Sequence, residues 1–389
     1  MVEILLGTSG WSYAEWVGPF YQSEDENKLT FYSKIFRTAE VDSTFYSYPS
    51  RGLVYGWARY TQPNFILSAK LPSLITHEKK LDISRGVDKD LDRFLQLMTP
   101  LHTRAKLGPI LIQLPPRFGK DYTRLEAFLK ILPTDFRFAV EFRDLSWLRE
   151  ETWILLKRYN VAYTIVDEPL LPPDTVITAD FTYVRWHGRG KRPWYNYFYT
   201  KGELKAWLTR LKEISTHVDE IFGYFNNHFH GYAVENCLQL LKMLSSLNEM
   251  QSATLERIKE YFLPTTTGQK PKEAPKLVSA MSFEDLLSAF IPKQKLIRTE
   301  QIRDDEVRML RVDDKIIKSE IRGYHVVIDL ERCEILHDCP DWVRCVADKT
   351  FCKHLGKIFL LIPRVKAEEV LRRMFSELDL WVFKPYLER

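Results

Sequence analysis

Two His and two Cys lie near the C-terminal end of the sequence, in the order His337-x-Cys339 and then Cys352-x-His354. The apolar run HVVIDL (325–330) before them predicts a strand, and LGKIFLLI after them predicts a helix that ends by Pro363. A strand pair presenting the first two side chains and a helix start presenting the last two would gather four N and S donors. Zn²⁺ prefers such a tetrahedral set. The pattern therefore predicts a zinc site at His337, Cys339, Cys352 and His354.

Two alternatives stay open for this segment. Four of the five cysteines fall between 333 and 352, so Cys333 or Cys345 could replace His337 as a ligand. These cysteines could also be small core residues without any metal. If the four ligands are those named above, protein fills every position, so the zinc is structural, with about one ion per chain.

A second group of reactive residues follows the ends of short apolar runs earlier in the chain. Carboxylates, an amine and an imidazole are candidates for general acid and base catalysis, and we assign them this role: Glu40, Lys70, Glu141, Asp167 and His187. Polar and aromatic neighbours are candidates for ligand binding: Trp11, Asp42, Tyr46, Gln113, Arg143, Arg185, Asn226 and Asn227. Lys70, Arg143 and Arg185 could clamp a phosphate or carboxylate. Trp11, Tyr46 and Trp186 could offer flat faces to a sugar or base.

The runs that precede these residues predict eight strands at 3–9, 37–43, 65–70, 109–115, 137–143, 161–167, 182–188 and 220–227. Amphipathic stretches with helical periodicity separate most of them. Eight such units predict a (β/α)₈ TIM barrel, in which active residues gather at the C-terminal ends of the strands. An open doubly wound sheet is the alternative, but the Gly-rich dinucleotide fingerprint is missing after the first strand.

The polar residues at the predicted strand ends, called the polar rim below, also have a purely structural interpretation. Salt bridges of Lys70 with Glu40 and of Arg143 with Glu141 would then do no more than close the barrel. A metal in the barrel is not favoured, because His77, His187 and His228 lie on different predicted loops.

The bulk properties place the chain among globular proteins. It has 389 residues, 45% hydrophobic residues and a formal net charge of +4. We expect a barrel at 1–264, a linker at 265–275 that lacks large apolar residues, and a small α+β domain at 276–389. No apolar stretch approaches a membrane span and the N-terminus does not resemble a signal peptide, so we expect a cytoplasmic protein without membrane contact.

Two resemblances add to these inferences. The motifs GTSGWSY, AEVDSTFYSYP, SAKLPSLITH, FAVEFRDLSW, YVRWHG and YFNNHFHGYAVEN, all within residues 3–245, are similar to the YecE-like family of TIM barrels, a domain of unknown function. That family usually has Asn where this chain has Asp42. Residues 322–363, with CPDW and CKHL, resemble the SWIM zinc finger, whose pattern is Cys-x-Cys, a spacer and Cys-x-His; His337 replaces the first Cys.

The resemblances imply a barrel and a finger that binds DNA or another protein, but no reaction. The rim suggests a hydrolase, nuclease-like enzyme or isomerase acting on a phosphate-bearing, nucleotide-like or nucleic-acid ligand, with the zinc finger targeting it. The alternative is a non-catalytic scaffold that binds DNA or a protein partner through the finger.

Overall fold

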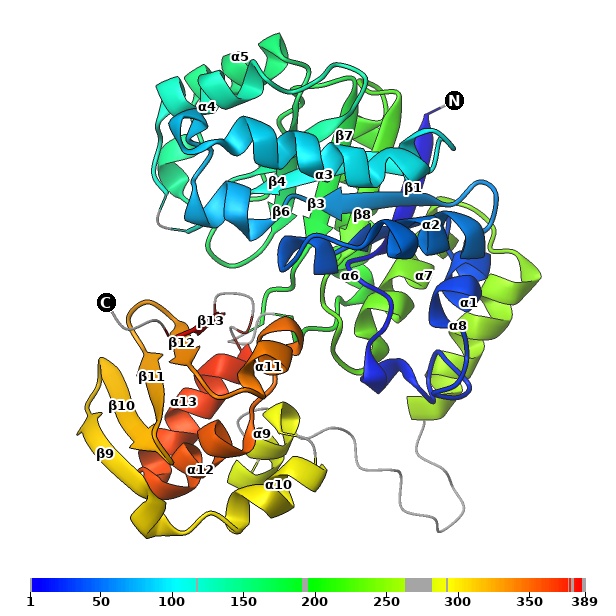
Figure 1. The fold of residues 1–389 in the computed structure, drawn as a ribbon. Coiled ribbons are helices and arrows are strands. Elements are labelled where there is room, and N and C mark those ends of the chain that lie inside the picture. The colour runs from blue at the N-terminus through cyan, green and yellow to red at the C-terminus, as the bar shows by residue number, and fades with distance from the viewer. Residues whose placement is uncertain are drawn as a thin grey trace. The chain divides into compact units, whose positions relative to one another are not determined.

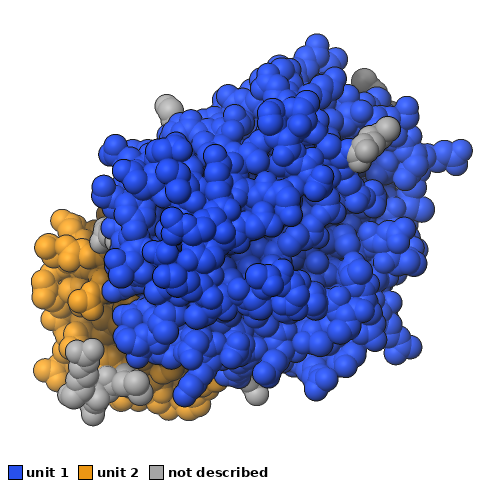
Figure 2. All heavy atoms as spheres, turned by 90° about the horizontal axis from the view of Figure 1, so that it is seen from above, with its two compact units in different colours: residues 1–269 blue, residues 270–389 orange. Residues whose placement is uncertain are grey.

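The structure is a computed structural model that describes residues 2–116, 118–190, 195–262, 282–291, 293–376, 378 and 381–386. The chain divides into two compact units, residues 1–269 and residues 270–389 (Figure 2). The predicted linker at 265–275 and the boundaries predicted on either side of it lie outside the described residues.

Unit 1 is built on eight parallel strands in the order β1-β8-β7-β6-β5-β4-β3-β2 (Figure 1). An isolated parallel bridge between Ser9 and Glu40 links β1 to β2, which stand at the two ends of this order, so the sheet is a nearly closed barrel. This confirms the predicted fold class, and each predicted run overlaps one strand. The strands are β1 (Glu3–Thr8), β2 (Thr38–Val41), β3 (Ile66–Lys70), β4 (Leu107–Gln113), β5 (Phe138–Glu141), β6 (Ala162–Asp167), β7 (Phe181–Trp186) and β8 (Glu220–Phe225).

Helices follow most of the strands and cover the outside of the barrel, as the helical periodicity predicts. None of the helices in the described part of the chain is both long and apolar enough to cross a lipid bilayer. The helices of unit 1 are α1 (Lys28–Ile35), α2 (Arg51–Tyr60), α3 (Val87–His102), α4 (Tyr122–Leu129), α5 (Glu150–Arg158), α6 (Lys201–Ile214), α7 (Tyr232–Leu244) and α8 (Glu249–Phe262).

Alternation along the strands determines which side chains reach the barrel interior. Tyr183 of β7 joins a buried cluster made of strand residues, while Trp186 packs against Trp207 and Phe225 in the layer between strands and helices. Trp186 is therefore a core residue, and the expectation that it offers a flat face to a ligand is wrong.

Unit 2 contains a five-stranded sheet in the order β13-β12-β11-β10-β9, with helices packed around its own apolar core. The predicted strand at 325–330 is β11, and the helix predicted up to Pro363 is α12. The strands are β9 (Val307–Val312), β10 (Ile316–Ile321), β11 (Tyr324–Asp329), β12 (Glu334–His337) and β13 (Val382–Pro385). The helices are α9 (Phe283–Phe290), α10 (Lys293–Glu300), α11 (Trp342–Asp348), α12 (Lys353–Leu361) and α13 (Arg364–Ser376).

Candidate functional site

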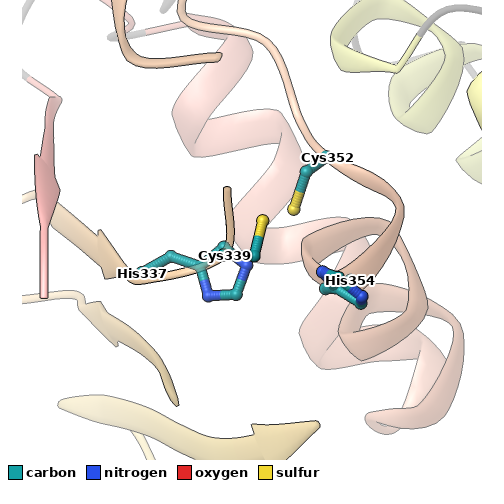
Figure 3. Close-up of side chains that lie close together, drawn as sticks. All are labelled: His337, Cys339, Cys352 and His354. Atoms are coloured by element: carbon teal, nitrogen blue, oxygen red, sulfur yellow. The ribbon is translucent and has the colours of Figure 1, made fainter. Parts of the chain in front are cut away.

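His337, Cys339, Cys352 and His354 lie together in unit 2. One ligand atom from each residue lies within 4.8 Å of the other three, and all four side chains are buried. Figure 3 shows the two sulfur atoms facing each other, with the imidazole rings beside them. The group is therefore able to hold a metal ion.

Two secondary-structure ends position these ligands. His337 is the last residue of β12, and Cys339 follows in the next turn. Cys352 caps the N-terminus of α12, where its sulfur accepts a hydrogen bond from the backbone N–H of Leu355 at 3.4 Å. This N–H and the positive end of the helix dipole oppose part of the increase that Cys339 and burial cause in the pKa of Cys352.

Each imidazole of the group has one buried ring nitrogen without a hydrogen-bond partner among the described residues. Nδ1 of His337 lies 2.5 Å from the backbone carbonyl of His325, and this contact places the ring proton on Nδ1. Nε2 of His337 and Nδ1 of His354 have no hydrogen-bond partner among the described residues. Buried polar atoms seldom stay unpaired, so two such nitrogens beside two sulfurs fit a metal with N and S ligands.

The two sulfurs influence each other's protonation. The neighbouring Cys352 thiol lowers the pKa of Cys339 against the opposing effect of burial, and the imidazoles add to the decrease. The same contact, together with burial, raises the pKa of Cys352. One thiolate is thus formed readily, and a cation between the sulfurs would favour loss of the second proton.

The other cysteines lie outside this group. Cys333 accepts a hydrogen bond from Arg373 at 3.2 Å, and Cys345 accepts one from Lys295 at 3.6 Å. Cys237 is buried in α7. His337, rather than Cys333 or Cys345, therefore completes the group of four.

In unit 1, Arg185 links two acidic residues across the barrel. Its guanidinium donates to Glu40 and to Glu141, with both N–O distances at 2.7 Å. Tyr183 also donates to Glu40, at 2.7 Å, and Ser9 donates to the same carboxylate. All these groups are buried, so the side chain of Arg185 holds β7 against β2 and β5 by charge-assisted hydrogen bonds.

Arg143 lies between two carboxylates of different character. It donates from Nε to Glu141 and from Nη1 to Glu168, the latter at 3.2 Å. Burial alone would raise the pKa of the Glu141 carboxyl, but the guanidinium groups of Arg143 and Arg185 hold that pKa well below its usual range. Burial raises the pKa of Glu168, and Arg143 offsets only part of this increase. The pair therefore contains one ionised carboxylate and one carboxyl that retains its proton more readily.

Lys70 and Asp167 also have charged partners. Lys70 donates to Asp42 at 2.7 Å, whereas Glu40 pairs with Arg185. The predicted salt bridge of Lys70 with Glu40 is therefore wrong, while that of Arg143 with Glu141 is present. Asp167 accepts hydrogen bonds from Arg189 and from the indole of Trp207, both at 2.5 Å.

His187 and Asn226 form one hydrogen-bonded pair at the ends of β7 and β8. The Nδ2 atom of Asn226 lies 2.9 Å from Nδ1 of His187, and Nε2 of His187 lies 3.6 Å from Glu141. Burial and the nearby Arg185 lower the pKa of His187 to about 3, so the imidazole is neutral near pH 7.

Of the remaining residues predicted to bind a ligand, one contacts Glu141 and three contact other parts of the barrel. Gln113 donates to Glu141 at 2.8 Å and so joins the network. Asn227 instead bonds Asn236 and the carbonyl of Tyr197. Trp11 and Tyr46 are half-buried and contact Trp57 and Phe45, respectively.

The sequence analysis did not name two residues that lie among these polar side chains, Glu168 and Tyr195. Glu168 directly follows Asp167 at the end of β6, and only Asp167 was predicted to be a functional residue at that strand end. The ring of Tyr195 lies 5.8 Å from that of His187 and 5.9 Å from that of His228. The Glu168 side chain carried a usable signal, since it is a second acid at a strand end.

Comparison with known proteins agrees with the barrel. The UPF0759 protein YunF of Bacillus subtilis is 28% identical over 267 residues, which are 62% of this chain and 94% of YunF. The crystal structure of a DUF72 family protein from Thermotoga maritima is 32% identical and covers 62% of this chain and 99% of its own, with a TM-score of 0.56. A DUF72 family protein from Enterococcus faecalis is 25% identical and covers 63% of this chain and 98% of its own, with a TM-score of 0.54.

The family described as "Protein of unknown function DUF72" matches residues 5–259. This range begins within β1, contains the other seven barrel strands and ends before the His and Cys group of unit 2. The YecE-like resemblance is thereby confirmed for the barrel, and the chain belongs to the DUF72 family.

Proposed function

We propose that unit 2 contains a SWIM-type finger, at about residues 322–363, that folds around one structural Zn²⁺ held by His337, Cys339, Cys352 and His354. The observation that supports this most strongly is the group of four buried side chains with donor atoms close together, in which each imidazole also has a ring nitrogen without a partner among the described residues. A set of two thiolates and two imidazoles suits zinc, because soft sulfur and borderline nitrogen ligands select it over the hard cations.

The proposed zinc is structural because the protein supplies four ligands and leaves no position for water or substrate. The order His-x-Cys, spacer, Cys-x-His follows the SWIM pattern with one exchange at His337. An imidazole can take the place of the first thiolate without changing the tetrahedral geometry.

Metal analysis of the full chain tests this proposal. Wild-type protein should contain about one zinc per chain, and Cys352→Ser should lose it. Cys345→Ser is the matched control, because Cys345 is equally buried in the same unit but lies outside the group. Equal zinc content in the Cys352→Ser and Cys345→Ser proteins would contradict the proposed ligand set.

For unit 1, we propose an acid–base centre at the C-terminal end of the barrel, in a hydrolase or isomerase. Glu141 and Glu168 share Arg143, but the pKa of Glu141 is lowered and that of Glu168 is raised, and a pair of carboxyls with separated pKa values suits one base and one acid. Glu168 would act as the acid, Glu141 as the ionised partner, and neutral His187 as a hydrogen-bonding group beside them.

The same contacts support acid–base chemistry better than a phosphate clamp. Lys70, Arg143 and Arg185 each already pair with at least one carboxylate, so a phosphate would have to displace an acid from its partner. The charges of the described rim residues therefore do not specifically favour a phosphate-bearing or nucleotide-like ligand.

A ligand panel tests the proposed centre. Wild-type protein and Glu168→Gln should be compared for thermal shifts with sugars, sugar phosphates and nucleotides. A ligand of the centre should stabilise wild-type protein, and its effect should change in Glu168→Gln but not in Glu151→Gln, an exposed glutamate on α5. Equal responses of the two variants to every stabilising ligand would contradict this role for Glu168.

A binding scaffold is the second candidate function, with the finger recognising a partner. Lys357 beside the finger pairs with Asp304 at 2.6 Å, and Lys349 donates to the carbonyl of Leu378 at 2.7 Å. Because these two cations already have partners, they add little support for a DNA-binding face at the finger. Loss of a copurifying partner in Cys352→Ser, but not in Cys345→Ser, would support the scaffold role.

A further inference from the structure

We infer that the outer face of α2 and the adjacent part of α3 bind single-stranded nucleic acid. This site is separate from the finger and from the acid–base centre, and it does not depend on either proposal. It is defined by the exposed residues Arg51, Tyr55, Arg59, Tyr60 and Arg104, together with the neighbouring pair Tyr48 and Arg93, and is called the arginine–tyrosine face below.

Helical spacing places three of these residues on one side of α2. Arg51, Tyr55 and Arg59 recur every four residues and are all exposed, while Val54 and Trp57 are buried on the opposite side. The α2 helix packs against α3, and Figure 1 shows the two helices on the outside of the same barrel. Arg104 lies just beyond the C-terminal end of α3, and its guanidinium lies over the ring of Tyr55 on α2.

Arginine groups lie over tyrosine rings at four places on this face. Arg51 and Arg104 lie 5.7 and 5.6 Å from the ring centroid of Tyr55. The Arg59 guanidinium lies 5.8 Å from the Tyr60 ring, and Arg93 lies 4.5 Å from the Tyr48 ring. The residues Tyr55 and Tyr60 are 42% and 51% exposed, so a further flat group has access to them.

These arginines also lack acidic partners. Within the described residues, none of Arg51, Arg59, Arg93 and Arg104 forms an ion pair with a carboxylate. For α2 the sequence contributes to this, because it contains no Asp or Glu from Ser43 to His77, and Asp90, which lies near Tyr48, pairs with Lys79. On α4 and α5 of the same barrel, by contrast, Arg124 and Arg158 pair with Asp82 and Glu126.

Guanidinium groups without acidic partners beside exposed aromatic rings match the chemistry of a single strand. Phosphates would supply the missing negative charges, and unstacked bases would stack on tyrosine rings and guanidinium planes. A duplex hides its bases, and an acidic peptide would use the arginines but not the rings. The combination therefore favours single-stranded DNA or RNA over both.

Binding of labelled oligothymidylate and oligouridylate of about 20 nucleotides to the full chain tests this inference, because such strands exceed the ~4–16 nucleotides of comparable sites. Arg51→Gln/Arg59→Gln/Arg104→Gln should bind at least tenfold more weakly. The slope of log K against log salt should fall by about 2, since each lost phosphate contact contributes about 0.7 for single strands.

A second variant separates stacking from charge. Tyr55→Leu/Tyr60→Leu keeps every arginine, so its affinity should drop by about tenfold or more while the salt slope stays unchanged. Arg124→Gln/Lys130→Gln/Arg158→Gln removes the same formal charge from α4, its C-terminal end and α5 and should bind nearly as well as wild type.

Three results would overturn the inference. The first is absence of binding by wild-type protein at low salt. The second is an equal loss of affinity in the two triple variants, which would indicate net charge alone. The third is unchanged affinity in Tyr55→Leu/Tyr60→Leu with equally strong competition by polyglutamate, which would indicate an acidic protein partner instead.

Discussion

The Nδ1 atom of His337 lies 2.5 Å from the backbone carbonyl oxygen of His325 on the neighbouring strand. The antiparallel pairing of β11 with β12 makes this contact possible, since His337 is in register with Val326. The hydrogen bond fixes the imidazole tautomer and directs Nε2 toward Cys339, Cys352 and His354. Metal-binding histidines commonly use their second nitrogen in this way.

Replacement of His337 should separate its role as a ligand from its role in packing. His337→Cys restores the Cys-x-Cys order and should retain about one zinc per chain, because thiolate and imidazole are interchangeable zinc ligands. His337→Ala removes the donor and should bind zinc at least tenfold more weakly in a competition titration with a chelating dye. Equal zinc affinity for the Ala and Cys proteins would show that His337 is not a ligand.

Removal of the metal should unfold unit 2 and leave the barrel folded. Structural zinc contributes ~10–16 kcal/mol to the folding of small fingers, whereas the apolar core of the barrel is separate from the core of unit 2. Limited proteolysis with and without a strong chelator should show cleavage after about residue 282 only in the treated sample. Protection of unit 2 in the chelator would argue that its apolar core suffices.

The group of four candidate metal ligands could be predicted from the sequence because these residues lie close together along the chain and between a strand and a helix with clear apolar patterns. Strands β9 and β10 were not predicted. Four of the six residues of β9 are exposed, and β10 includes Lys318 and Glu320, so neither strand has the continuous apolar run of a buried strand.

Arg185 should be a major contributor to barrel stability. Arg185→Met leaves Glu40 and Glu141 buried without their shared cation, which costs about 3–5 kcal/mol for a broken buried pair. Urea unfolding followed by circular dichroism measures this loss. Arg158→Met, at an exposed pair with Glu126, should change the free energy of unfolding by no more than about 1 kcal/mol. Similar effects of both substitutions would contradict the importance of the buried network.

The two carboxyls on Arg143 should affect stability in opposite directions as pH changes. Glu141 has a lowered pKa in the folded state, so it stabilises the fold above the unfolded pKa of ~4.3 and loses this effect as pH falls. Glu168 has a raised pKa, so its stabilising contribution is present below ~4.3 and is lost as pH rises through the folded pKa.

Melting temperatures of Glu141→Gln and Glu168→Gln between about pH 3 and pH 8 test this difference. Relative to wild type, Glu141→Gln should become less stable as pH rises, whereas Glu168→Gln should become more stable. Parallel pH profiles for the two variants would contradict the assignment of one ionised and one proton-retaining carboxyl.

The barrel strands could be predicted because apolar runs such as 109–115 and 161–167 are buried on both faces. The partners of the rim charges could not be predicted in the same way. Arg185 reaches Glu40 and Glu141 because the closed sheet brings side chains of β2, β5 and β7 to the same level of the interior. Lys70 pairs with Asp42 rather than Glu40 for the same reason, since Glu40 is already engaged by Arg185.

X-ray absorption at the zinc edge of the purified full chain tests the proposed finger most directly. Two sulfur neighbours at about 2.3 Å and two nitrogen neighbours at about 2.0 Å are expected for His337, Cys339, Cys352 and His354. A shell of four sulfurs would require Cys333 and Cys345 as ligands, and a shell with only nitrogen and oxygen would place the metal elsewhere. Either result would contradict the proposed site.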